Sequence, residues 1–298
     1  MTNSRYENVH ALVADPFLQG RDDAETALRA LGVGTVSVVG GLDAALQMID
    51  GEFVDLLIMA TEWPDGDSAE AIISIRHAEI GQNPFMLILA VSDETDSQAS
   101  WRPLRYGADI LMIPPLDETV LGIRLQELVS SRKRFVATSD YVGPDRRAES
   151  GRETTIPLLA VPNSVADKAN GVFDPEAFAA TTANTMKEVN GQKLERHAAQ
   201  LVLLANRVGP DLLIRGTDEA SRVFLEEMTW IAEDAERRLA DTAPGEAAKA
   251  CQALISHISH LDSRRGVLPS TEVGKLIQLA NAVGPSILRR RRVRGTAD

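Results

Sequence analysis

Short apolar runs alternate with helical patterns along the first 130 residues of the chain. The runs are short, mostly apolar throughout and bounded by Gly, Pro or charged residues, which is typical of strands buried on both faces of a parallel sheet. They are His10–Ala14, Thr35–Val39, Leu56–Ala60, Pro84–Val91 and Ile110–Ile113. Helical spacing of apolar residues predicts helices over 22–31, 43–49, 68–79, 96–106 and 117–132. This alternation predicts a doubly wound α/β domain with a parallel five-stranded sheet.

The pattern changes beyond residue 133. Residues 149–171 are rich in Thr, Pro, Asn, Ser and Gly, a linker composition that contains one short apolar run, Ile156–Val161. From Asp174, a helix N-cap followed by proline, the chain is helical in pattern, with candidate helices over 174–189, 192–208, 217–240, 244–262 and 270–283 and a short one from Pro285. We therefore divide the chain into an α/β domain (1–133), a connector (134–173) and an α-helical output or dimerisation domain (174–298).

A seven-residue frame recurs in the helical part. Leu204-Ala-Asn206-x-Val-Gly-Pro210 returns as Leu279-Ala-Asn281-x-Val-Gly-Pro285. Glycine is a common residue just after a helix, and proline cannot continue the hydrogen-bond ladder, so we expect both frames to mark helix ends. The recurrence indicates a duplicated helical unit, or two helices that dock in equivalent ways.

The charge distribution narrows the choice of partners. Residues 1–130 contain 21 acidic and 7 basic side chains, whereas residues 154–298 contain 18 of each. An acidic domain is repelled by phosphate backbones, so a nucleic-acid partner is not expected for it. The sequence contains no apolar segment long enough to span a membrane and no signal peptide, so we expect a cytoplasmic protein. The single cysteine, Cys251, lies in a helical pattern, and we expect it to be a small buried apolar residue. We expect no cofactor.

Several landmarks in the α/β part occur in one order. Asp15 follows the first strand, Phe53-Val-Asp55 introduces the third, and Pro64-Asp-Gly follows it. Tyr106-Gly-Ala-Asp109 precedes the fifth strand and Pro114-Pro115 follows it. With this spacing, residues 8–132 resemble the receiver domain of bacterial two-component response regulators. The resemblance implies a CheY-like, flavodoxin-like topology and a role in phosphorelay signalling.

The residues that carry receiver chemistry are largely replaced. Receivers hold Mg²⁺ with two acidic residues after the first strand and the phosphoacceptor aspartate, and bind the phosphoryl oxygens with a hydroxyl and a lysine. On the resemblance, Asp15 retains the first acidic position, although a register shifted by one residue would pair Ala14 with Asp15. The second acid, the phosphoacceptor, the hydroxyl, the switch aromatic and the lysine fall on Pro16, Ala60, Leu89, Leu111 and Pro114. We expect a pseudo-receiver that forms no aspartyl phosphate, and we assign no metal ligand.

The connector contains Tyr141-Val-Gly-Pro-Asp-Arg-Arg147 and resembles a segment that follows some bacterial receivers. Gly-Pro-Asp predicts a turn, and the aromatic residues and arginines could tie the segment to the acidic domain. Another interpretation is an anionic ligand, such as a cyclic dinucleotide, held by arginines. The arginines considered for such a site are Arg132, Arg134, Arg146 and Arg147.

The helical part contains three histidines, His197, His257 and His260, none in a recognisable catalytic context. We therefore expect a non-enzymatic, phosphorylation-independent signalling protein that contacts a histidine kinase, a receiver or an output protein, and homodimerisation stays open. One alternative is a phosphatase or kinase-binding modulator whose activity resides in the helices. Another is anionic-ligand or nucleic-acid binding through arginine clusters, including the tail 289–294.

Overall fold

The chain forms two compact units, Met1–Val189 and Asn190–Asp298, which are described separately. The computed structural model describes residues 5–93, 101–146, 156–240, 245–264 and 266–294. The first unit continues past the predicted boundaries at 133 and 173 and includes the start of the long helix α7 (Pro175–Ile214). The division of the chain into an α/β domain, a connector and a helical domain stays a prediction.

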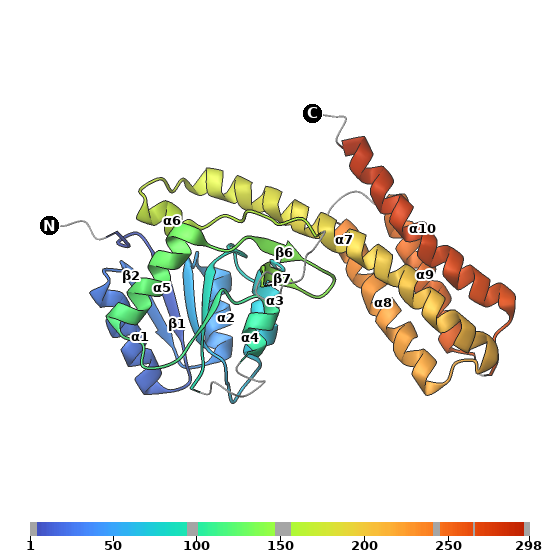
Figure 1. The fold of residues 1–298 in the computed structure, drawn as a ribbon, viewed down its shortest axis with the longest axis horizontal. Helices are drawn as coiled ribbons and strands as arrows, with labels where there is room; N and C mark the ends of the chain where they lie inside the picture. Colours follow the sequence, from blue (N-terminus) through green and yellow to red (C-terminus); the bar gives the residue numbers. More distant parts are fainter. Residues whose placement is uncertain (1–4, 94–100, 147–155, 241–244, 265, 295–298) are drawn as a thin grey trace. The chain divides into compact units, whose positions relative to one another are not determined.

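The first unit is built on a five-stranded sheet in the order β2-β1-β3-β4-β5, whose neighbouring strands all run parallel (Figure 1). This order is that of doubly wound, flavodoxin-like folds, so the predicted fold class is confirmed. The strands are β1 (His10–Ala14), β2 (Thr35–Val39), β3 (Leu56–Ala60), β4 (Leu87–Val91) and β5 (Ile110–Met112).

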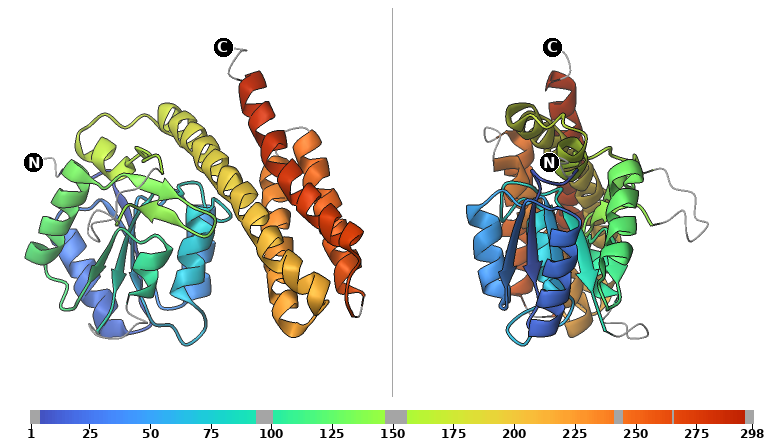
Figure 2. Two further views of the ribbon diagram at one scale, coloured as in Figure 1. Left: turned by 45° about the vertical axis from the view of Figure 1, so that its right-hand side comes forward. Right: turned by 90° about the vertical axis from the view of Figure 1, so that its left-hand side faces the viewer.

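Two layers of helices cover the sheet, as Figure 2 shows. Alternate residues of a strand point to opposite faces, so Ala11 and Val13 pack with α1 and α5, whereas Leu12 and Ala14 pack with α2, α3 and α4. These helices are α1 (Leu18–Ala30), α2 (Leu42–Gly51), α3 (Ser68–Arg76), α4 (Arg102–Tyr106) and α5 (Glu118–Ser131). The start predicted for the fourth helix, residue 96, lies outside the described residues.

The connector is an ordered part of the first unit. Strands β6 (Phe135–Ala137) and β7 (Val142–Pro144) form an antiparallel hairpin, and Phe135 exchanges backbone hydrogen bonds of 2.8 Å with Leu159. Helix α6 (Ser164–Ala169) follows and buries Val165 in the core. The prediction of a turn at Gly-Pro-Asp was wrong, because Gly143 and Pro144 lie in β7. The interpretation of residues 149–171 as a linker was also wrong for the part that the structure describes, because Leu159 and Val165 are buried in the packing of the first unit.

A largely buried ion cluster joins the connector to the α/β layers. Arg76 Nη2 and Arg132 Nε donate to the two carboxylate oxygens of Asp109, at 2.9 and 2.8 Å. Both arginines also donate to the carbonyl oxygen of Met86, at 2.8 and 3.2 Å. Their guanidinium carbons lie 5.2 and 4.9 Å from the ring centroid of Phe135, within cation–π distance. One carboxylate and one aromatic ring thus hold α3, β5 and the start of the connector together.

A second ion pair attaches α6 to the amino-terminal edge of the sheet. Lys168 Nζ lies 2.7 Å from Asp55 Oδ2, which also accepts a hydrogen bond from the His10 backbone N–H at 2.8 Å. The ammonium group lies 5.2 and 4.8 Å from the ring centroids of Phe53 and Phe173. Asp55 is fully buried, and Lys168 is the cation paired with it.

The second unit is helical, and its described part contains the end of α7 with α8 (Glu219–Ala240), α9 (Glu246–Asp262) and α10 (Ser270–Arg294). Leu, Ala, Val and Ile side chains from all of them form one core, which includes the buried Cys251, as its sequence context predicts. The prediction of helix ends at the two Gly-Pro pairs was wrong. Pro210 lies inside α7 and Pro285 inside α10.

Core packing explains why both helices continue through proline. Val208 and Leu212 flank Pro210, Val283 and Ile287 flank Pro285, and all are buried in the helical core. Burial of one such aliphatic side chain contributes roughly 1.5–3 kcal/mol, so the two that flank each proline offset its cost of about 3 kcal/mol.

The recurrent frame is a helix-packing motif. A Cβ atom on Gly209 would lie 3.3 Å from Val273 of α10, and one on Gly284 would lie 3.6 Å from Ala198 of α7. Gly209 therefore allows α10 to approach closely, whereas a Cβ on Gly284 would make an ordinary van der Waals contact with α7. This reciprocity agrees with the expectation of two helices that dock in equivalent ways.

We expect Asp109→Asn to lower the free energy of unfolding of the first unit by roughly 3–5 kcal/mol, because it leaves two buried arginines without a counter-charge. Asp43→Asn, at an exposed position in the first turn of α2, serves as a control with little effect. Urea unfolding followed by circular dichroism measures both. Equal stability of the two variants would contradict the structural role of the cluster.

The same variant has a defined pH dependence. Burial alone would raise the pKa of Asp109, but the charges of Arg132 and Arg76 outweigh it and hold the pKa below its usual value. Burial lowers the pKa of Arg76 to about 10, so this partner remains charged at neutral pH. The stability difference between wild type and Asp109→Asn should be full above about pH 4, the ordinary pKa of an aspartate, and should shrink as the pH falls through the lower folded-state value.

Candidate functional site

The carboxyl-terminal edge of the sheet brings Asp15 and Ala60 together. Strands β1 and β3 pair with Ala14 opposite Met59, so the residues that follow in each strand are neighbours at this edge. Strand β2 is added on one side of β1, and β3 to β5 are added on the other side. The point between β1 and β3 is therefore the switch point of the strand order, where doubly wound folds place their ligands. Ala60 is 8% exposed and supplies a methyl group. No nucleophile therefore stands at the end of β3.

The carboxylate of Asp15 is turned toward the start of α1. Its Oδ1 accepts a hydrogen bond from the Phe17 backbone N–H at 2.7 Å, and its side chain lies against Gly20. Arg21 Nη1 donates to the Asp15 carbonyl oxygen at 2.7 Å. Burial raises the pKa of Asp15, the Phe17 hydrogen bond opposes this, and nearby Asp93 adds to the rise. The surviving acid thus has a local structural role as a cap for the turn into α1.

This edge does not fit a bound magnesium ion of the receiver type. A divalent cation of this kind favours several oxygen ligands and usually binds one or two carboxylates. Pro16 and Ala60 supply none, Asp15 is engaged with the backbone, and Asp93 is exposed. Among the described residues, no group of three or more acidic, histidine or cysteine side chains could hold a metal ion.

Leu89 does not lie at the carboxyl-terminal edge of the sheet, so its assignment to the position of the receiver hydroxyl was wrong. It pairs with Ile58 in the middle of β4 and is buried in the core under α1 and α5. Val91 is the residue opposite Ala60, so the strand reaches the edge at Ser92, which is 4% exposed. In the sequence, the apolar run of this strand continues to Val91, and Ser92 is the first polar residue after it. The end of the run was therefore the signal that a hydroxyl residue, Ser92, lies at the edge.

The remaining two replacements lie on and after β5. Leu111 pairs with Ala90 and packs, half-buried, against the core formed with α2, α3 and α4. Pro114 is exposed beyond the end of β5 and precedes Pro115 through a cis peptide bond. Proline carries no amine to bind a phosphoryl oxygen. The edge therefore keeps one acid, Asp15, and has side chains without charge at Ala60 and Pro114.

The arginines considered for an anion site do not converge. Arg132 is engaged with Asp109 and with the carbonyl oxygens of Phe85, Met86 and Pro162. Arg146 Nη2 donates to the carbonyl oxygens of two residues before β5, at 2.6 and 2.9 Å. Arg134 is exposed, and Arg147 lies outside the described residues. The structure thus gives Arg132 a structural role, which corrects the expectation of an anion contact.

The histidines of the second unit are mostly internal. His197 is fully buried, with Nε2 2.7 Å from Asp234 Oδ2. Burial would raise the pKa of Asp234, but hydrogen bonds from His197 and Arg238 outweigh this and keep it well below its usual value. His257 Nε2 lies 2.9 Å from the Glu272 carbonyl oxygen. The sequence did not predict the His197–Asp234 pair. The two residues are 37 positions apart on different helices, and no local pattern relates them.

No protein-family model matches the chain, and no curated protein matches it. Its N-terminal part is similar to CheY-like receiver domains of solved structure. The chemotaxis protein CheY4 of Vibrio cholerae is 21% identical, with a TM-score of 0.36, over 40% of this chain and 97% of that one. A receiver domain from Bermanella marisrubri is 24% identical, with a TM-score of 0.35, over 41% of this chain and 98% of that one.

A mutant of the receiver domain of a histidine kinase from Arabidopsis thaliana is also 24% identical, over 43% of this chain and 97% of that one, with a TM-score of 0.35. The first unit thus has a receiver-like fold, defined by its own strand order, and an all-helical region follows it. None of the helices, as far as the structure describes them, is long and apolar enough to cross a membrane.

We expect Ala60→Asp to create a weak cation site at the carboxyl edge. The new carboxylate would stand beside Asp15, so their repulsion should lower the melting temperature in the absence of Mg²⁺. Millimolar Mg²⁺ should then recover part of the loss in Ala60→Asp and leave the wild type unchanged. Calorimetry with and without Mg²⁺ measures this. An equal response to Mg²⁺ in both proteins would show that Asp15 does not neighbour position 60 in solution.

Proposed function

We propose that this protein is a non-enzymatic, phosphorylation-independent signalling protein whose pseudo-receiver acts by protein–protein contact in a two-component pathway. The observation that carries the proposal is Ala60 at the end of β3, in a sheet that otherwise has the receiver arrangement. The support comes from the joint loss of several groups at one edge, with the scaffold around them retained.

Phosphoryl transfer depends on placing charged groups around a reacting phosphorus atom. At this edge, Ala60 removes the acceptor, Pro16 removes one carboxylate and Pro114 removes the ammonium group. Ser92 retains a hydroxyl at the edge, but without a cation or lysine it cannot by itself neutralise a bound phosphoryl group. Loss of these groups together removes the electrostatic stabilisation on which the reaction relies.

The same edge presents an apolar surface that suits protein contact. Phe17 and Leu18, directly after Pro16, are each 64% exposed. They lie beside Asp15, at the start of α1, in a domain with a strong excess of acidic residues. Aromatic and aliphatic residues surrounded by charge are typical of interface centres. A partner with an apolar patch and a basic rim, on a histidine kinase, a receiver or an output protein, would fit this surface.

The helical unit is proposed as the output or dimerisation part, and homodimerisation stays open. Helix α7 belongs to both compact units, so the chain passes between them without a loop. The rival function, a phosphotransfer regulator in the helices, has no observation that favours it. His197 is fully buried and hydrogen-bonded to Asp234, and His257 is 4% exposed, so neither is presented to a partner. His260 is exposed, and its Nε2 lies 3.8 Å from Glu272 Oε1.

Acetyl phosphate with Mg²⁺ should leave no phosphoryl adduct on the full-length protein, because position 60 cannot accept the group. Intact-mass spectrometry at neutral pH measures the adduct, with a receiver that has its aspartate as a positive control in the same mixture. A stable adduct within residues 1–133 would contradict phosphorylation independence.

Leu18→Asp should weaken binding to the cognate partner at least tenfold, because it places a charge in the centre of the proposed contact surface. An aspartate in the first turn of α1 is favourable for the helix, so folding should be retained. Val172→Asp, at a position that is 68% exposed outside this surface, is the matched control. Binding of both variants to a panel of purified kinases, receivers and output proteins of the same organism decides the matter. Equal binding by the two variants would remove the α1 surface from the proposal.

A further inference from the structure

A groove of about 320 Å³ lies between α8 and α9 in the helical unit. Its apolar part consists of the buried Leu225 and Ile258 and of Trp230. The ring of the buried His197 packs edge-to-face against Trp230, with ring centroids 6.1 Å apart, and Trp230 remains 52% exposed. The groove therefore presents an indole surface that a buried side chain holds in place.

The charged part of the groove is acidic. Three carboxylates and no basic side chain line it, counted over the residues that the structure describes. Asp262 is paired with Arg222, whose Nε lies 3.5 Å from Asp262 Oδ1. Glu226 and Glu233 are exposed and have neither an ion pair nor a hydrogen bond within the described part of the chain. The groove is therefore a local negative site with two uncompensated charges.

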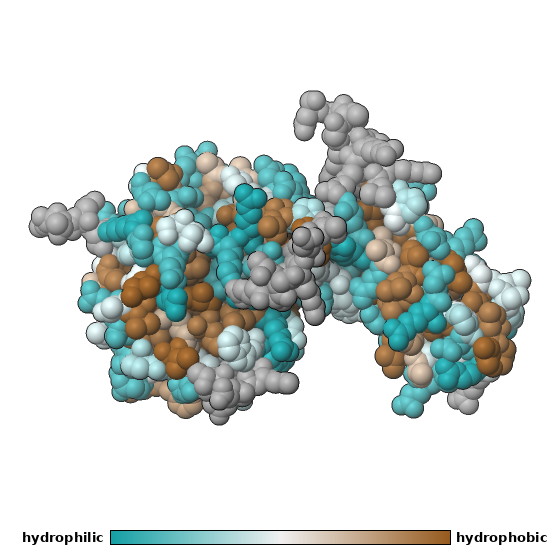
Figure 3. Space-filling model, in the orientation of Figure 1, coloured by the Kyte–Doolittle hydropathy of each residue, from teal (hydrophilic) through white to brown (hydrophobic). Residues whose placement is uncertain are grey.

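The acidic and apolar residues alternate along one face of α8. Glu226, Trp230 and Glu233 follow one another at helical spacing, and Val223, which is 58% exposed, continues this face by one turn. Figure 3 shows hydrophobic residues among hydrophilic ones at the surface of the helical unit. An exposed tryptophan flanked by carboxylates is typical of a contact surface for a basic partner.

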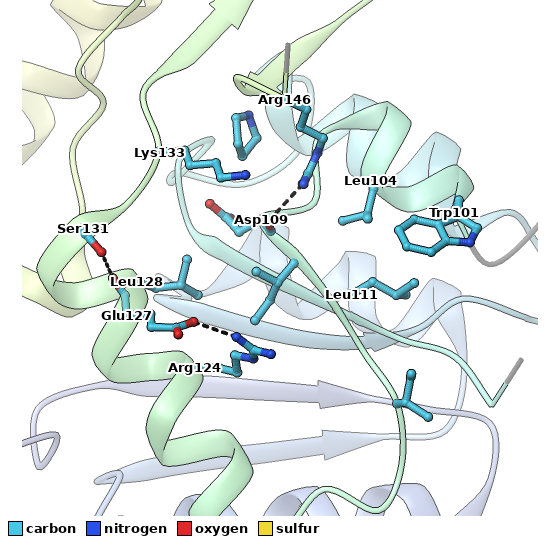
Figure 4. A pocket seen from close by; sticks show the side chains of 13 residues that line it. Trp101, Leu104, Asp109, Leu111, Arg124, Glu127, Leu128, Ser131, Lys133 and Arg146 are labelled. Atoms are coloured by element: carbon cyan, nitrogen blue, oxygen red, sulfur yellow. Dashed lines mark hydrogen bonds and ion pairs between the residues drawn. The ribbon is translucent and has the colours of Figure 1, made fainter. Parts of the chain in front are cut away.

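The cavity of about 520 Å³ beside β5 differs from this groove, because its charged groups are used within the chain (Figure 4). Asp109 belongs to the ion cluster described above, and Arg146 donates to two backbone carbonyl oxygens. Arg124 Nη1 lies 2.8 Å from Glu127 Oε2. In the groove between α8 and α9, by contrast, two charges remain unpaired.

The segment that complements this groove in charge is the end of α10. Residues 289–294, here called the arginine tail, contain five arginines and no acidic residue. Helices α8 and α9 together contain eight acidic and four basic residues, whereas α10 contains one acidic and six basic residues. Guanidinium groups form paired hydrogen bonds with carboxylates and pack on tryptophan rings, so arginine is the residue type that suits this groove best.

Helices α8 and α10 run in the same direction, because both are antiparallel to α7. Gln200 of α7 hydrogen-bonds Glu227, and Asn190, earlier in α7, hydrogen-bonds Arg238, later in α8. The glycine positions described above relate α7 and α10 in the same antiparallel sense. Positions along α8 and α10 can therefore be compared directly.

The arginine tail of one molecule is carried away from the groove of the same molecule. Gly284 faces α7 beside His197, which binds Asp234 of α8, so Gly284 and Asp234 mark one level of the bundle. At a rise of about 1.5 Å per residue, the backbone of Arg292 lies about 12 Å beyond this level, whereas Trp230 lies about 6 Å before it. The complementary surfaces are thus separated along the bundle and meet only between two molecules.

We propose that the groove between α8 and α9 binds the arginine tail of a second copy of this chain. In an antiparallel pair related by a two-fold axis, each tail would stand at the level of the other copy's groove, so both contacts form together and the assembly closes as a dimer. The inference rests on the dimerisation role proposed for the helical unit and does not depend on whether the first unit accepts a phosphoryl group.

Charge reversal on each side, followed by mixing, tests this pairing in the full-length protein. The groove variant carries Glu226→Arg and Glu233→Arg, and the tail variant carries Arg289→Glu, Arg290→Glu, Arg291→Glu and Arg292→Glu. Each variant alone brings like charges together, so its self-association should be at least tenfold weaker than that of the wild type. An equimolar mixture pairs each groove with a tail of opposite charge and should form a heterodimer with close to wild-type affinity. Sedimentation equilibrium measures all three.

The control variant, Glu188→Arg with Glu246→Arg, reverses two charges at exposed positions outside the groove and should self-associate as the wild type does. Glu226→Gln with Glu233→Gln keeps the shape of the groove and should weaken association by a smaller factor, and added salt should weaken the wild-type dimer. Circular dichroism should show the same helix content in every variant.

A wild type that stays monomeric throughout the micromolar range would overturn the proposal. So would wild-type association in either charge-reversed variant, or a mixture that does not recover the dimer. If the tail variant dissociates and mixing does not restore association, the arginines serve another partner, such as a nucleic acid, and the pairing is excluded. These outcomes leave the acetyl phosphate experiment unaffected, so failure of the pairing is distinguishable from failure of the proposed function.

Discussion

The neutralisation of Asp109 by two buried arginines is the interaction on which the first unit depends. Each group alone would be costly to bury, and together they join α3, the start of β5 and the beginning of the connector. Phe135 packs against both guanidinium groups, so the hairpin that follows α5 is placed by the same cluster. The connector is consequently a structural element of the α/β unit. Arg132 and Arg146 are both used to hold this segment in place, through Asp109 and through backbone carbonyl oxygens.

The two edges of the sheet have different roles. At the amino-terminal edge, charged residues are paired and covered: Asp55 by Lys168, and Asp109 by Arg76 and Arg132. At the carboxyl-terminal edge, where a receiver would concentrate charge, the side chains are alanine, proline and one acid engaged with the backbone. Stability is therefore supplied away from the edge that carries chemistry in receivers. Substitutions at the carboxyl edge therefore leave these stabilising ion pairs intact.

The helical unit shows how packing can outweigh a local signal. Both Gly-Pro pairs carry strong local preferences for ending a helix, yet α7 and α10 continue through them, because buried aliphatic residues on either side offset the cost of the proline. Gly209 lets α10 approach closely at one of these positions, and Gly284 faces α7 at the other. The recurrence in the sequence was a sign of equivalent docking, and only its interpretation as a helix end was wrong.

The amino-acid sequence by itself determined the α/β fold, the strands and most of their bounds, and the alanine at the end of β3, because these follow from short-range hydrophobic patterns and from the identity of one residue. Tertiary structure decided that Leu89 is a core residue and Ser92 the edge residue, that Arg132 is bound to Asp109, and that His197 meets Asp234. It also joined Trp101, Lys133 and Arg146 around one cavity. These relations link residues far apart in the chain, and no local pattern records which charges and surfaces will meet once the layers pack.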